Sequence, residues 1–230
     1  MHIIMKKLEF LPPDAIVQNE AEAQKKVLDS IKLKLTFKPY LIIFSNNNDD
    51  DTSVAFCWRS LLADKKSEIT IFAFEDDLNL MKDFDNYEYI PLSQESTFII
   101  EDRIFTIKHS HKGYELMELP YVYSERQAKS IARVVNADLN LVWDICLAYC
   151  ENEPLCYVWY GKSNIDESKS FYIPLFPEDV DKINYLDYLG FINKNKPIIN
   201  EKMIYEFVYD KTDGLVIKRL CPMLNDGPHS

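Results

Sequence analysis

Residues 203–220 read MIYEFVYDKTDGLVIKRL, two largely apolar runs separated by a polar turn that ends in glycine. Both runs are rich in aromatic and β-branched residues, which favour strands. The turn Lys211-Thr212-Asp213-Gly214 contains the Asp-Gly pair that is typical of a tight chain reversal. The stretch therefore predicts a β-hairpin formed by Met203–Tyr209 and Leu215–Leu220.

The same pattern occurs about one hundred residues earlier in the chain. The hairpin start Glu101-Asp102-Arg103-Ile104-Phe105 corresponds to Glu201-Lys202-Met203-Ile204-Tyr205. Further matches follow in the same order along the chain: Trp58 with Trp159, Phe74-Glu75-Asp76-Asp77-Leu78 with Phe176-Pro177-Glu178-Asp179-Val180, Tyr89-Ile90 with Phe191-Ile192, Gly113 with Gly214 and Pro120 with Pro222. Because the order is preserved and the offset is nearly constant, we interpret the chain as two tandem copies of one unit.

Each copy is predicted to be α+β, with a mostly antiparallel sheet and helices on one face. The capping-box sequence Ser124-Glu125-Arg126-Gln127 predicts a helix that runs to about Ala137, and Pro177 is expected to open a helix over Glu178–Leu189. The apolar segments Val54–Leu62 and Leu139–Tyr149 fit either a strand or a buried helix. The predicted domains are residues 1–120 and 121–230.

The composition restricts the partners and the compartment. The chain has 230 residues, 37 of them acidic and 26 basic, for a formal net charge of −11. Such a charge repels nucleic-acid phosphates and anionic lipids and attracts basic proteins. The strongest apolar run, Tyr40–Phe44, is too short to span a bilayer. Five cysteines without regular spacing are typical of reduced thiols, so we expect a cytoplasmic protein without nucleic-acid or membrane partners.

No catalytic or metal-binding constellation is recognisable in the sequence. His109 and His111 are the only close histidine pair, and no third ligand lies near them. Cys146 and Cys150 would stand one turn apart on a helix, but their neighbours are apolar, which favours buried thiols. We therefore expect no cofactor, no metal and no catalytic residue.

Two acidic clusters are the candidate partner-binding residues. Asp49, Asp50 and Asp51 end the polar segment 46–51, which is predicted to be a loop. The second cluster consists of Glu75, Asp76 and Asp77. It recurs in the second copy at the start of a predicted short helix, where the helix dipole favours acids and a structural role is the alternative.

These features favour a non-enzymatic, acidic protein-binding module, and within that class an immunity-type inhibitor that neutralises a basic toxin or effector in the cytosol. Tyr185 and Tyr188, expected on a helix, are amphipathic side chains suited to anchoring a partner. The alternative is an enzyme or small-ligand sensor with a carboxylate-lined cleft between the two copies, to which Asp76 and Asp179 would contribute.

The loop hypothesis makes a first prediction. Replacing Asp49, Asp50 and Asp51 with Asn is expected to leave the melting temperature nearly unchanged, because exposed charges contribute little to folding. Association with a basic partner is expected to become slower and less dependent on salt, because peripheral charges act mainly on the encounter rate. Association kinetics at low and high salt measure this. An association rate at low salt that equals the wild-type rate would show that the loop is not part of the interface.

Overall fold

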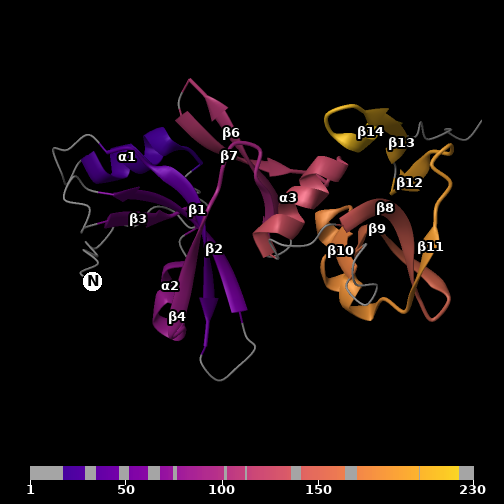
Figure 1. The fold of residues 1–230 in the computed structure, drawn as a ribbon, viewed down its shortest axis with the longest axis horizontal. Coiled ribbons are helices and arrows are strands. Elements are labelled where there is room, and N and C mark those ends of the chain that lie inside the picture. Colours follow the sequence, from indigo (N-terminus) through magenta and orange to yellow (C-terminus); the bar gives the residue numbers. More distant parts are fainter. Residues whose placement is uncertain are drawn as a thin grey trace, which may run out of the picture. The chain divides into compact units, whose positions relative to one another are not determined.

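The computed structural model of the chain describes residues 18–28, 35–46, 52–61, 68–74, 77–100, 103–111, 113–135, 141–163, 170–201 and 203–222. The described residues form mostly β-structure, arranged in four small antiparallel sheets with few short helices (Figure 1). By its contacts the chain divides into two compact units. The first comprises residues 1–96 and 105–118, and the second comprises residues 97–104 and 119–230.

The first unit contains a four-stranded sheet. Its strands are β1 (Lys38–Ser45), β2 (Thr52–Leu61), β3 (Glu68–Phe72) and β4 (Asn86–Pro91), in the order β3-β2-β1-β4. The helix α2 (Asp77–Asp83) connects β3 to β4. Leu80 and Met81 of α2 pack with Phe84 against a buried cluster of Ile42, Phe44, Ala55 and Cys57. The central strands β1 and β2 therefore supply the core of this sheet.

The second unit contains a sheet of the same strand order, β10-β9-β8-β11. Its strands are β8 (Leu141–Cys150), β9 (Glu153–Ser163), β10 (Ser170–Pro174) and β11 (Tyr188–Phe191). Two 3-10 helices, η1 (Pro177–Asp179) and η2 (Asp181–Tyr185), take the place of α2. Ile183 and Leu186 pack against a buried cluster of Cys146, Ala148, Cys156 and Val158.

Each four-stranded sheet is followed in the chain by a three-stranded sheet of matching order. The first is formed by β5 (Thr97–Ile100), β6 (Arg103–Ser110) and β7 (Gly113–Leu119). The second is formed by β12 (Ile198–Asn200), β13 (Met203–Asp210) and β14 (Gly214–Pro222), which confirms the hairpin predicted from residues 203–220. The shared strand orders agree with the proposed repeat, whereas duplication and the boundary at residue 120 stay predictions.

The two tryptophans Trp58 and Trp159 occupy equivalent places in the two four-stranded sheets. Trp58 lies opposite Ile71 of β3, and Trp159 lies opposite Ile173 of β10. Both indole rings are fully buried, and the Nε1–H of Trp159 donates to the carbonyl of Val122 at 2.7 Å. Burial of so large a ring contributes strongly to each core, and in the second unit the indole N–H is satisfied.

The α+β prediction was wrong, because the described residues are mostly strands in four small antiparallel sheets and the helices are few and short. The helices α1 (Glu20–Leu28), α2 and α3 (Glu125–Val135) have only 9, 7 and 11 residues. The helix predicted over Glu178–Leu189 is replaced by η1, η2 and the strand β11. Asp, Asn and Tyr, which are frequent in this segment, are weak helix formers, and the chain at 188–191 gains ladder hydrogen bonds with β8 instead. Among the described helices, none has the length and apolar character needed to cross a bilayer.

A capping box begins the helix that precedes each four-stranded sheet. At α3 the hydroxyl of Ser124 accepts the N–H of Gln127 at 3.3 Å, and the Gln127 side chain accepts the N–H of Tyr123 at 3.0 Å. The prediction for Ser124 is thereby confirmed. At α1 the same two bonds recur: Asn19 accepts from the N–H of Glu22 at 3.0 Å, and Glu22 accepts from the N–H of Gln18 at 2.9 Å.

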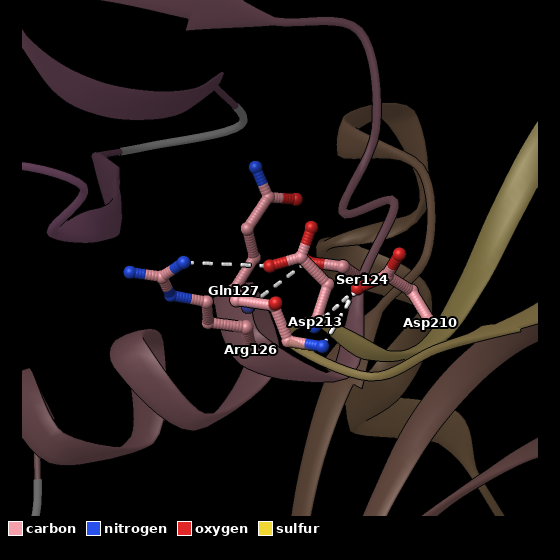
Figure 2. Close-up of polar contacts among 6 residues, drawn as sticks. Ser124, Arg126, Gln127, Asp210 and Asp213 are labelled. Atoms are coloured by element: carbon pink, nitrogen blue, oxygen red, sulfur yellow. Dashed lines mark hydrogen bonds and ion pairs between the residues drawn. The ribbon is translucent and has the colours of Figure 1, made fainter.

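Each capped helix is also fastened to a hairpin turn of its own unit. The Glu125 carboxylate accepts the N–H of Leu215 at 3.2 Å, directly after Gly214, whose φ is +73°. Figure 2 shows the first turn of α3 beside this hairpin, where Arg126 pairs with Asp213 at 3.4 Å. In the first unit Glu20 accepts the N–H of Tyr114 at 3.4 Å, after Gly113 with a φ of +88°.

Two observations favour glycine at both positions. A positive φ costs a residue with a side chain roughly 1–2 kcal/mol. A Cβ atom added at Gly214 would also overlap the Glu125 carboxylate, and one added at Gly113 would overlap the Glu20 carboxylate. The glycine and the glutamate thus form one contact, which we call the helix–hairpin clasp, and it occurs once in each unit.

The clasp predicts the cost of losing either glycine. Gly214→Ala is expected to lower the free energy of unfolding by roughly 2–3 kcal/mol, since left-handed strain adds to the loss of a charge-assisted hydrogen bond. Gly113→Ala is expected to act similarly on the first unit. Urea unfolding followed by tryptophan fluorescence measures both, with Thr212→Ala in the exposed turn as a control. Unchanged stability in Gly214→Ala would show that the clasp is unimportant.

Candidate functional site

The structure describes only one of the six predicted partner-binding acids. Asp49, Asp50, Asp51, Glu75 and Asp76 lie outside the described residues. Asp77 is the first residue of α2, and one of its carboxylate oxygens is buried. The prediction for the Asp49–Asp51 loop therefore stays a prediction, and Asp77 directs at least part of its carboxylate into the protein.

The counterpart of Asp77 in the second unit serves the fold of that unit. Asp179 ends η1 with only 4 % of its surface exposed, and its carboxylate pairs with the Lys182 ammonium at 2.6 Å. A buried carboxylate needs such a partner, because removing a charge from water is costly. The alternative hypothesis of a carboxylate-lined cleft needs Asp179 to be accessible to a ligand, and this pairing does not favour it.

The histidine and cysteine candidates do not form a metal site among the described residues. His109 lies in β6 with its ring edge-on to Tyr114 at 5.0 Å, and His111 lies in the following turn. No group of three or more His, Cys, Asp or Glu residues in the described part is arranged to hold a metal ion. Cys146 and Cys150 lie on strand β8 and not on a helix.

Three of the described thiols are buried in the two sheets. Cys57 belongs to the core of the first unit, and Cys146 and Cys156 belong to the core of the second. Burial raises the pKa of the Cys146 and Cys156 thiols to about 11 each, and it raises the pKa of Cys57 well above its ordinary value. The thiolate is the nucleophilic form of cysteine, so these thiols are unreactive at neutral pH.

Large apolar side chains exposed to solvent are concentrated in the second unit. Of the described residues, those with large exposed apolar side chains all lie between positions 142 and 220: Val142, Tyr185, Tyr188, Phe191, Ile199, Tyr209 and Leu220. Three aromatic residues fall close together in the chain. Tyr185 ends η2, and Tyr188 and Phe191 are the two ends of β11. We call these three residues the β11 patch.

The strand β11 is an edge of its sheet. Among the described strands it pairs only with β8, as can be followed in Figure 1. Tyr188 lies opposite Tyr149, and Phe191 lies opposite Cys146. Because side chains alternate along a strand, Tyr188 and Phe191 project from opposite faces of the sheet. The exposed fractions are 45 % for Tyr188 and 74 % for Phe191.

A stacked ring pair fixes the Tyr188 side of the patch. The rings of Tyr149 and Tyr188 are parallel, with an interplanar angle of 3° and centroids 4.9 Å apart. The Tyr188 hydroxyl donates to the side chain of Asn152 at 3.4 Å. A Cβ atom added at Gly190 would lie 2.9 Å from a Tyr149 ring carbon, so the missing side chain leaves space for that ring. The Tyr188 ring is thus held in one orientation by Tyr149 and Asn152.

The equivalent edge strand of the first unit has its aromatic residues turned inward. The guanidinium of Arg59 lies over the Tyr89 ring at 3.9 Å and pairs with Glu68 of β3. Tyr40 meets the Tyr89 ring edge-on at 6.1 Å. Such cation–π and aromatic contacts hold Tyr89 against the sheet. The aromatic side chain Tyr89 of β4 is therefore packed on its sheet, whereas Tyr188 and Phe191 of β11 are exposed.

Sequence reasoning found part of the β11 patch and misplaced it. Tyr185 and Tyr188 were expected to anchor a partner from a helix, whereas one ends a 3-10 turn and the other begins an edge strand. Phe191 was missed. The signal was the stretch Tyr188-Leu189-Gly190-Phe191, which has no charge and no proline and follows a segment rich in weak helix formers. Comparisons with protein families, curated proteins and solved structures give no match.

The buried thiols lead to a chemical prediction. At pH 7.5 a thiol of pKa about 11 is less than about one part in a thousand thiolate. Brief treatment of the native protein with iodoacetamide is expected to leave Cys57, Cys146 and Cys156 unmodified, and the same treatment in urea should modify them. Peptide mass spectrometry reads the result. Rapid labelling of Cys146 or Cys156 in the native protein would contradict the assignment of these thiols to the core.

Proposed function

We propose that this chain is an acidic protein-binding module whose partner is a basic protein, and that it acts as an immunity-type inhibitor of a basic toxin or effector in the cytosol. The observation that carries the proposal is the β11 patch on a chain whose net charge is −11. Exposed aromatic residues supply affinity at protein interfaces, and complementary charge speeds the encounter.

The distribution of charged side chains supports binding rather than chemistry. Several described carboxylates already have partners within their own unit: Glu68 pairs with Arg59, Asp179 with Lys182, and Glu125 with Lys129 and the N–H of Leu215. These groups stabilise the fold. The net negative charge then acts on a partner as a long-range field, which steers a basic protein to the surface.

An inhibitor of this kind would bind quickly and in a salt-dependent manner. Proteins captured from the native host on the immobilised full-length chain, and identified by mass spectrometry, are expected to include a basic protein. The purified partner should associate more slowly as salt rises, because screening weakens steering. Its own activity should be lost at a one-to-one molar ratio.

Two results would contradict the proposed function. One is a specific partner that is acidic or neutral. The other is a basic partner whose association rate is the same at low and high salt. A charge variant tests the steering. In this variant Asp181 and Asp187, two exposed residues close in the chain to Tyr185 and Tyr188, are replaced by Asn, and its association with the captured protein is compared with that of the wild-type chain. This variant should associate more slowly at low salt and at nearly the wild-type rate at high salt.

A further inference from the structure

We propose that the free edge of β11 receives an extended, basic segment of the partner protein as an added β-strand. This inference rests on the proposed function and names the surface and the kind of segment. An edge strand presents unpaired backbone groups to one side, and a peptide in the extended conformation can continue the sheet there.

The hydrogen-bonding direction of β11 shows which backbone groups are available. The carbonyl of Tyr149 accepts the N–H of Asp187 at 2.8 Å, so the backbone groups of Tyr149 face β11. Backbone groups alternate in direction along an antiparallel strand. Tyr188 and Gly190 are paired with Tyr149 and Leu147 and therefore face β8, whereas the N–H and C=O groups of Leu189 and Phe191 point toward the free edge.

Of the four edge strands in the two four-stranded sheets, only β11 lacks the features that protect sheet edges. Natural sheets blunt their edges with charged residues and prolines. The edge strand β4 carries Glu88 and Pro91, β3 begins with Glu68, and β10 ends with Pro174. The four residues of β11, Tyr188–Phe191, include neither a charge nor a proline. One unprotected edge among the four edges of these two sheets favours a surface that is covered in the working complex.

The side chains of β11 would contact an added strand on both faces. The residues of such a strand that project on one face would lie beside Tyr188, whose ring is held by Tyr149. Those that project on the other face would lie beside Phe191. Gly190, between them, has no side chain to obstruct the approach of a second backbone. Alternate apolar side chains in the segment would gain the most from these contacts.

The charges near Tyr188 favour a basic segment. Asp187 precedes the strand, and Glu151 and Glu153 lie in and after the β8–β9 turn, all three exposed. The carboxylate of Asp187 accepts the N–H of Glu151 at 2.6 Å, which keeps two of these acids together. Lys or Arg side chains of an added strand would meet this acidic end. A second copy of this chain is the less suitable occupant, because each copy carries a net charge of −11.

A model peptide tests the edge directly. The probe is a labelled, end-blocked peptide of about eight residues in which Lys alternates with Val or Tyr, a pattern typical of strands. One control peptide has Glu in place of Lys, and a second has N-methylated amides on alternate residues. Fluorescence anisotropy is expected to show binding of the Lys peptide to the full-length chain. Hydrogen exchange at Leu189 and Phe191 should slow in its presence, and neither control peptide should bind.

Matched variants assign the binding to β11. Phe191→Lys introduces a charge at an exposed position of the strand and is expected to weaken binding of the Lys peptide by about tenfold or more. Tyr209→Lys makes the same change at an aromatic residue that is 77 % exposed in the β13 hairpin, and it should change binding by less than about twofold. Unchanged circular dichroism spectra confirm that both variants are folded.

The outcomes separate this inference from the proposed function. Absence of binding, equal binding of the N-methylated peptide, or equal losses in Phe191→Lys and Tyr209→Lys would overturn strand addition at β11. If Phe191→Lys still binds the basic host protein as tightly as wild type does, the proposed function stands and the β11 inference fails. If the Lys peptide binds but the host partner is not basic, the edge is a docking surface and the proposed function fails.

Discussion

The contact on which each unit depends is the one between a helix-initiating glutamate and a left-handed glycine in a hairpin turn. Glu125 binds the N–H that follows Gly214, and Glu20 binds the N–H that follows Gly113. Backbone bonds join the same elements, from Leu116 to Gln18 at 2.6 Å and from Ile217 to Tyr123 at 2.8 Å. Short helices are marginal by themselves. The clasp therefore gives α1 and α3 a fixed place against the hairpins.

The two units share one arrangement and differ where the fold does not depend on it. Both units keep the clasp, the buried tryptophan and the strand order. They differ at the last strand of the four-stranded sheet. In the first unit Tyr89 is held inward under Arg59, and in the second Tyr188 and Phe191 face solvent. Rigid sheets with one altered edge are well suited to recognition, because the binding residues are held in place before the partner arrives.

The features that were predicted correctly from the sequence are those that neighbouring residues specify. The hairpin around Gly214 and the capping box at Ser124 were predicted because each is specified by residues adjacent in the chain. The segment of β2 stayed ambiguous, since a strand buried on both faces, as at Ala55–Trp58, loses its two-residue period. The hydrogen bond between Glu125 and Leu215 joins residues that are far apart in the chain. The local sequence around neither residue predicts it. The edge position of β11 likewise depends on pairing with β8, which no local pattern encodes.

Hydrogen–deuterium exchange of the complex with the captured basic partner tests the central claim most directly, because it reports every backbone amide of the native chain at once. The account predicts that binding slows exchange at Leu189 and Phe191 of β11 and leaves the equivalent strand β4, residues Asn86–Pro91, at its free rate. Protection of β4, or of surfaces elsewhere with β11 unchanged, would contradict it.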